Sequence, residues 1–158
     1  MVNKTVEAIL REKKISEVVN PKLVQAPPTT SIQEAVQLMQ SQKSGYIVVS
    51  KGKKVVGMLT ETDLIRKVLE KDVDWTKPIS DFMSDQPIAL NINDSVAKAI
   101  EVMGEKHFYH IPLLNDKNEL VNVISVRTLI RFFAEFYPVE VYNLPPRHNQ
   151  IIEHREGG

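Results

Sequence analysis

The sequence contains no cysteine, no excess charge of either sign and no long apolar run. Without cysteine the chain has no disulfide bonds, no thiolate metal ligands and no thiol catalysis. Its 20 basic residues balance 20 acidic ones, so no long-range field attracts nucleic acid or an anionic membrane. We therefore expect neither partner, and any anionic ligand must be bound by local groups.

The longest apolar runs, such as residues 46–49, fall far short of the roughly 20 residues that a membrane-spanning helix needs. Residues 1–7 lack the apolar core and cleavage site of a secretory signal. With 42% hydrophobic and 25% charged residues, the composition is that of an ordinary globular protein. We expect a cytoplasmic protein without a membrane segment.

Signatures of catalysis are also missing. The sequence has no phosphate-binding Gly-x-x-x-x-Gly-Lys loop, no Gly-x-Ser-x-Gly elbow and no His-Glu-x-x-His pair. His107 and His110 are three residues apart, which on an extended segment points them to opposite faces, and no third ligand follows nearby. The sequence predicts neither an enzyme nor a metal site.

What the sequence does contain is an internal repeat. Residues 15–17 recur at 79–81, and residues 31–39 recur at 95–103, both 64 positions later. From residue 46 onward the match continues with an offset of 65 positions, so that residues 55–60 correspond to 120–125. A register shared over this length indicates a duplicated unit.

Each copy predicts the same elements. Ser31 is a good N-cap for a helix with one apolar face, and residues 46–49 and 54–59 are β-branched runs around a glycine turn. Thr60 then begins a second helix, and a short extended piece at 22–26 precedes the unit. The second copy predicts corresponding elements at 87–90, 95–103, 111–114, 120–124 and 126–136.

This tandem of β-α-β-β-α units resembles a pair of CBS (cystathionine β-synthase) domains, also called a Bateman module. The segments that carry the resemblance are 57–63, Gly-Met-Leu-Thr-Glu-Thr-Asp, and 110–114, His-Ile-Pro-Leu-Leu. The resemblance implies an α/β (α+β) fold of two units packed sheet to sheet with pseudo-twofold symmetry. It divides the chain into a leading helix (1–14), CBS unit 1 (15–74), CBS unit 2 (75–136) and a C-terminal tail (137–158).

The resemblance also implies a function. Many relatives bind AMP, ADP, ATP or S-adenosylmethionine in two clefts between the units and act as energy or metabolite sensors. We expect a non-catalytic regulatory module that binds an adenine nucleotide, requires no cofactor, forms a homodimer and controls another, unknown protein. The alternatives are a sensor of S-adenosylmethionine and a ligand-free interaction or dimerisation module.

In the family, the hydroxyl at the position of Thr60 binds a ligand phosphate, and the carboxylate at the position of Asp63 binds the ribose. A helix N-terminus offers unpaired N–H groups to an anion, and a carboxylate can accept both ribose hydroxyls. The competing interpretation is a capping box, in which Thr60 and Asp63 only satisfy backbone donors. We favour the nucleotide site because of the repeat and of Gly57.

The second copy departs from the pattern, because Asn122 replaces the glycine and Thr128 replaces the ribose-binding carboxylate. Ser125 keeps the hydroxyl, so the second cleft is predicted to be weaker or empty. The family arrangement implies further contacts from the opposite unit. For the first cleft these are Met83, Ile88, Phe108 and Tyr109; for the second they are Val19, Val24, Ser44 and Gly45. His110 stands where relatives often carry a basic residue that contacts phosphate, and a histidine that is half-charged near neutral pH can do so only in part.

The end of the last helix and the tail are rich in aromatic residues: Phe132, Phe133, Phe136, Tyr137 and Tyr142. This cluster either folds back on its own core or forms a partner surface. We predict that it mediates self-association.

Overall fold

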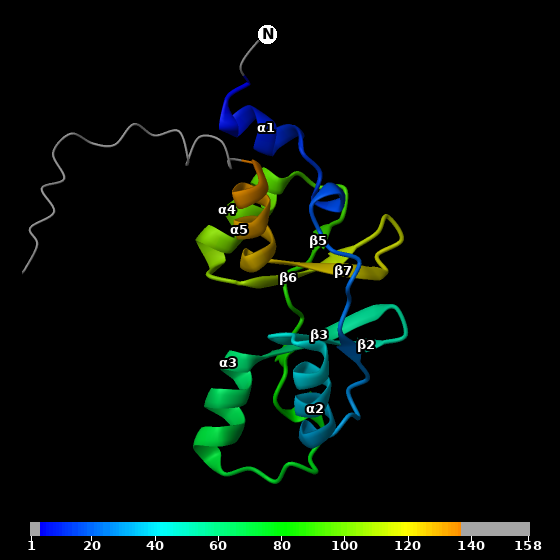
Figure 1. Cartoon of the computed structure of the whole chain (residues 1–158). Coiled ribbons are helices and arrows are strands. Elements are labelled where there is room, and N and C mark those ends of the chain that lie inside the picture. The colour runs from blue at the N-terminus through cyan, green and yellow to red at the C-terminus, as the bar shows by residue number, and fades with distance from the viewer. Residues whose placement is uncertain (1–3, 137–158) are drawn as a thin grey trace, which may run out of the picture.

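The chain folds into two small β-sheets that face each other at the centre of the molecule, with the longer helices on the outer sides (Figure 1). The structure is a computed structural model and describes residues 4–136. Two small sheets with helices packed on them confirm the predicted α/β fold class. Helix α1 (Val6–Glu12) lies at the end of the molecule that carries the second unit.

The first sheet has four strands in the order β1-β2-β3-β4. Its strands are β1 (Gln25–Ala26), β2 (Tyr46–Lys51), β3 (Lys54–Thr60) and β4 (Ser84–Asp85). The second sheet has the order β5-β6-β7. Its strands are β5 (Leu90–Asn91), β6 (His110–Leu114) and β7 (Leu120–Ser125). Each sheet contains a hairpin of two antiparallel strands, as the β-branched runs predict.

The helices begin where the sequence places hydroxyl caps. Ser31 caps α2 (Ile32–Gln42) and Ser95 caps α4 (Val96–Lys106). Helix α5 (Val126–Phe136) follows β7. The helical segment after β3 is irregular. It consists of α3 (Glu61–Asp63), the π-helical η2 (Leu64–Val68) and the 3-10 turn η3 (Leu69–Lys71).

Strand pairing corrects the alignment of the two repeats. Tyr46 pairs with Thr60, and His110 pairs with Ser125, so Tyr46 and His110 are equivalent. The alignment at 65 positions, which matched Tyr46 with Ile111, is therefore wrong for this strand, and the additional residue lies in the turn between β6 and β7. The physical reason is the alternation of faces in a strand, since a slip of one residue would move core side chains to the opposite face.

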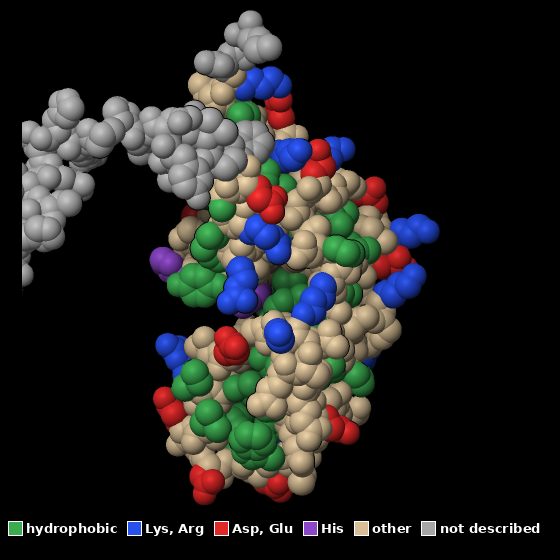
Figure 2. Space-filling view, in the orientation of Figure 1, with side chains coloured by type: hydrophobic (Ala, Val, Ile, Leu, Met, Phe, Trp, Pro, Cys, Tyr) green, Lys and Arg blue, Asp and Glu red, His purple; other side chains and the backbone are tan. Residues whose placement is uncertain are grey.

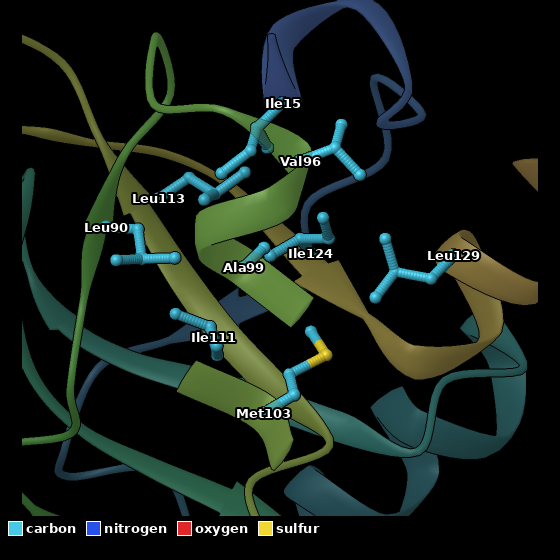
Figure 3. Close-up of a cluster of buried hydrophobic side chains, with 9 residues drawn as sticks. All are labelled: Ile15, Leu90, Val96, Ala99, Met103, Ile111, Leu113, Ile124 and Leu129. Atoms are coloured by element: carbon cyan, nitrogen blue, oxygen red, sulfur yellow. The ribbon is translucent and has the colours of Figure 1, made fainter. Parts of the chain in front are cut away.

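The two units exchange a short segment at their cores. Ile15, in the 3-10 turn η1 (Ile15–Glu17), is fully buried among the residues of the second unit, and its N–H donates to the Asp94 carbonyl over 2.9 Å (Figure 3). Ile79, in η4 (Ile79–Asp81), is buried in the first unit, and its N–H donates to the Thr30 carbonyl over 2.8 Å. Each repeat thus contributes its leading turn to the core of the other.

A third apolar cluster joins the two sheets. It consists of Val48 and Met58 from the first sheet and Leu120 and Val123 from the second. All four side chains are buried, so removing this surface from water stabilises the packing of one unit on the other. The expectation of two units packed sheet to sheet is confirmed.

Only part of the predicted aromatic cluster lies within the residues that the structure describes. The rings of Phe132 and Phe133 lie 5.8 Å apart, and Phe133 packs in part against the core of the second unit. The side chain of Phe136 and the residues Tyr137 and Tyr142 lie outside the part that is described. Between residues 4 and 136, no helix combines the length and apolar character needed to cross a membrane.

Candidate functional site

A cavity of about 830 Å³ lies where the two central hairpins meet. Tyr46, at the start of β2, and His110, at the start of β6, both line it, and their ring centroids are 5.1 Å apart. Helix α2 contributes Val36 and Met39 to its wall, and α5 contributes its first turns. The cavity is therefore built from both units, and neither repeat could form it alone.

Strand register places the polar residues of the second unit at this cavity. His110 pairs with Ser125, and the N–H of Val126 donates to the Tyr109 carbonyl over 3.0 Å. Tyr109 and His110 therefore line the cavity together with Ser125 and Thr128. The resemblance placed Tyr109 at the opposite cleft and gave His110 a contact with phosphate. Both residues lie here because the hairpin holds them beside the strand end that carries Ser125.

The first unit contributes Ser44 and Gly45, as expected for this cleft. The N–H of Glu61 donates to the Gly45 carbonyl over 3.1 Å, which places the Glu61 carboxylate at the cavity as well. A Cβ atom added to Gly45 would lie 3.2 Å from a Glu61 carboxylate oxygen, so the glycine allows this close approach. Ser44 donates its hydroxyl to the Tyr46 carbonyl over 2.8 Å.

Ser125 and Thr128 form a pair of hydroxyls at the N-terminus of α5. The Ser125 Oγ accepts a hydrogen bond from the Thr128 N–H over 3.1 Å and lies 3.1 Å from the Thr128 Oγ1. Thr128 is buried. The N–H groups of Val126 and Thr128 already donate to the Tyr109 carbonyl and to Ser125 Oγ, so this wall offers an anion the two hydroxyls and the partial positive charge of the helix dipole.

Basic side chains surround the same cavity. Lys22 and Lys43 come from the first repeat, and Arg127 and Arg131 come from α5. Glu61 is the single carboxylate among the lining residues. Lys and Arg side chains gather around the indentation between the two units in the space-filling view (Figure 2).

Two of the basic side chains are held in place by oxygen acceptors. The ammonium group of Lys22 donates to the Gln42 carbonyl at the end of α2. With the Asn20 amide turned so that its oxygen faces Arg131, that oxygen accepts from the two terminal guanidinium nitrogens over 2.9 and 3.0 Å. Neither acceptor carries a formal charge, so both cations keep their full positive charge at the cavity.

Burial lowers the pKa of His110 from its ordinary value of 6.5. Glu61 opposes the shift by attracting the imidazolium form, and Arg127 adds to it by repelling that form. His110 is therefore more neutral at pH 7 than the half-charged state expected from the sequence. Burial also raises the pKa of Tyr46, which keeps its phenol protonated.

Thr60 and Asp63 form a capping box at the start of α3. Asp63 Oδ2 accepts hydrogen bonds from the Thr60 N–H and hydroxyl, both over 3.0 Å, and the Asp63 N–H donates to the Thr60 Oγ1 over 3.3 Å. Lys67 pairs with the other oxygen, Asp63 Oδ1, over 2.9 Å. Both carboxylate oxygens thus have partners within the chain, and neither Thr60 nor Asp63 lines the cavity.

Met83 closes the space beside Gly57. A Cβ atom built on Gly57 would lie 2.3 Å from the Met83 sulfur and 3.0 Å from the Ser84 carbonyl oxygen. At the equivalent position in the second unit, Asn122 is buried and donates to the Asn20 carbonyl over 2.5 Å. The two clefts therefore differ at the position where the sequence analysis emphasised a glycine.

The remaining expected contacts are dispersed. Val24 is buried in the core of the first unit, and Val19 packs against the core of the second. Ile88 and Phe108 are exposed, at 38% and 44%. None of these four residues lines the cavity.

Sequence reasoning missed the basic residues. Lys22 and Lys43 lie in separate segments without a motif, and only the tertiary fold brings them to one place. Arg127 and Arg131 did carry a signal, because residues four apart on a helix share a face. Among the described residues, no group of three His, Asp or Glu side chains could hold a metal ion.

The CBS domain model matches residues 15–70 and 79–135. The chain therefore belongs to the CBS domain family, and it contains two of these domains in tandem. The resemblance suggested by the sequence is confirmed.

Solved structures share the fold. A CBS domain protein from Pyrobaculum aerophilum complexed with AMP is 25% identical, with a TM-score of 0.72, and the match covers 81% of this chain and 98% of that one. An uncharacterised conserved protein from Pyrococcus horikoshii is 27% identical, with a TM-score of 0.72, over 78% of this chain and 93% of that one.

Curated relatives include both small proteins and enzymes. An uncharacterised 17.7 kDa protein of Acidianus ambivalens is 24% identical over 80% of this chain and 77% of the relative. Inosine-5'-monophosphate dehydrogenase of Methanocaldococcus jannaschii is 27% identical over 82% of this chain, but the match spans only 25% of that enzyme.

Proposed function

We propose that this protein is a non-catalytic regulatory module that binds an adenine nucleotide in the cavity between its two CBS units. The observation that carries the proposal is the cavity itself, which combines the hydroxyls of Ser125 and Thr128 at a helix N-terminus with basic side chains from both units. Its volume of about 830 Å³ is in the range of small-molecule sites.

The comparison with known structures supports the same ligand class. The relative from Pyrobaculum aerophilum, which matches most of this chain, was solved with AMP. A ligand that contacts both units stabilises one arrangement of the two over others, because it binds only when both walls are in place. Such a coupling would let the protein report an adenine nucleotide level to the protein it controls.

The second candidate function is an interaction module that binds no ligand. The side chains of the first cleft favour it, because they already contact one another. Asp63 already accepts from Thr60 and pairs with Lys67, and Met83 occupies the space beside Gly57. That Thr60, Asp63, Met83, Ile88, Phe108 and Val24 contact a ligand stays an untested prediction. Our proposal places the nucleotide at the second cleft, the one that Ser125 and Thr128 line.

We also propose that the chain forms the expected homodimer. Three aliphatic side chains on the outer helices are more than half exposed: Ile65 at 52%, Leu69 at 59% and Ile130 at 63%. A second copy that packed against these helices would remove them from water.

One double variant and one single variant distinguish the clefts. Ser125→Ala with Thr128→Val removes the hydroxyls of the second cleft, and we expect it to weaken AMP or ATP binding by about tenfold in calorimetry. Asp63→Ala should leave the affinity within about twofold and lower the free energy of unfolding by about 1 kcal/mol through loss of the cap. The reverse pattern would assign the nucleotide to Thr60 and Asp63, and the absence of any binding would favour the ligand-free module.

A further inference from the structure

The cavity carries a charge surplus that the chain as a whole does not have. Among the described residues, four basic ones and one acidic one line it, a formal difference of +3, whereas the full sequence has 20 of each sign. Lys22, Lys43, Arg127 and Arg131 take part in none of the ion pairs found between residues 4 and 136. Because like charges repel, such a cluster destabilises the empty protein and favours a bound anion.

The four cations form two pairs on different elements. Arg127 and Arg131 are four residues apart on α5, beside the hydroxyls of Ser125 and Thr128. Lys43 is the C-cap of α2, and Lys22 donates to the carbonyl of Gln42, the residue before it. The cavity therefore has positive charge both at the N-terminus of α5 and at the C-terminus of α2.

A single phosphate does not match this arrangement. A phosphate monoester carries about two negative charges near neutral pH, and each further phosphate in a chain adds about one. A nucleoside monophosphate held at Ser125 and α5 would leave the lysine pair without a counter-charge. A di- or triphosphate carries about three or four charges, close to the surplus of the cavity.

From these observations we propose that the cavity selects adenine nucleotides with two or three phosphates over AMP, and that it rejects the cationic S-adenosylmethionine. The inference rests on the proposed function, because it concerns the same cavity. The neutral Thr128, at the position where the repeat of the first unit has Asp63, fits this selectivity because a carboxylate would repel additional phosphates. Glu61 is the one acidic group that opposes it.

Calorimetry with the full chain in about 0.15 M salt and EDTA tests the proposal, using AMP, ADP, ATP, S-adenosylmethionine and inorganic tripolyphosphate as ligands. We expect ATP to bind at least about tenfold more tightly than AMP, ADP to lie between them, and S-adenosylmethionine not to bind. The affinity for ATP should also fall more steeply with salt than that for AMP, because more charges are involved.

Charge variants give the matched controls. Lys43→Gln and Arg131→Gln should each narrow the ratio of ATP to AMP affinity by about fivefold, and Glu61→Gln should raise the ATP affinity. Lys117→Gln removes the same charge from an exposed turn outside the cavity and should change neither affinity. Circular dichroism establishes that each variant is folded before it is titrated.

The outcomes separate the two proposals. Equal affinities and equal salt dependence for AMP and ATP would overturn the charge selectivity and leave nucleotide binding in place. Tripolyphosphate binding as tightly as ATP would support the selectivity and overturn the proposed recognition of adenosine. Failure of every phosphate-bearing ligand to bind would overturn both.

Discussion

Tyr46 and His110 occupy equivalent positions in the two repeats, and their rings meet at the boundary between the units, with centroids 5.1 Å apart and planes inclined by 46°. Burial favours the neutral form of both side chains, since it raises the pKa of the Tyr46 phenol and lowers that of the His110 imidazole. At this contact between the two units, equivalent positions thus carry side chains that titrate in different pH ranges. Only the histidine can gain a proton in the physiological range.

This difference predicts a pH effect on stability. In the folded protein the pKa of His110 lies below 6.5, so the unfolded chain binds this proton more readily. The free energy of unfolding should be fully retained above pH 6.5 and fall as the pH drops through 6.5 toward the lower pKa of the folded state. Thermal melts of the wild type and of His110→Gln between pH 7.5 and 5.5 measure the effect, and the variant should lose less stability over this window.

His107→Gln is the control for that experiment. His107 lies three residues earlier and does not line the cavity. The variant should keep the pH dependence of the wild type. Identical curves for all three proteins would show that His110 does not control stability in this range.

Close packing beside Gly57 predicts that a single methyl group is destabilising. In Gly57→Ala the new Cβ would meet the Met83 sulfur at 2.3 Å, so Met83 must move. We expect a loss of about 1–3 kcal/mol in denaturant titrations. Because the two side chains compete for one space, Gly57→Ala combined with Met83→Ala should be less destabilising than the sum of the single changes. Strict additivity would contradict the contact.

The cluster between the sheets should contribute measurably to the stability of the pair. Val123 is 6% exposed in this cluster, whereas Val121 on the same strand faces solvent at 36%. Val123→Ala should cost about 1–2 kcal/mol, and Val121→Ala should stay within about 0.5 kcal/mol. Equal effects in chemical denaturation would mean that the sheets do not depend on this contact.

Self-association should depend on the exposed aliphatic side chains of the outer helices. Ile65→Glu combined with Ile130→Glu places charges where a second copy would pack, and light scattering should then report the 18.0 kDa monomer. Val6→Glu makes the same kind of change at a residue 47% exposed on α1 and should leave a dimer intact. If the double variant still scatters as a dimer, these aliphatic side chains do not form the interface, and the aromatic residues near the C-terminus become the predicted interface.

Local pattern and repetition predicted the main helices and strands of this protein, and the resemblance to CBS domain pairs implied how the two units pack. Ser31 and Ser95 cap helices at equivalent positions, and the β-branched runs form hairpins, because caps and strand alternation depend on neighbours in sequence. The capping box of Thr60 and Asp63 was also visible as an alternative, and the structure contains it.

Tertiary structure alone decided which side chains surround the cavity. Met83 lies beside Gly57, and Ile15 and Ile79 enter each other's units, through contacts between segments far apart in the chain. The same holds for Lys22 and Lys43, which come from separate segments, and for the meeting of these lysines with Arg127 and Arg131 of α5. Charges interact through space, so a chain with no net charge can still concentrate positive charge at one site once it is folded.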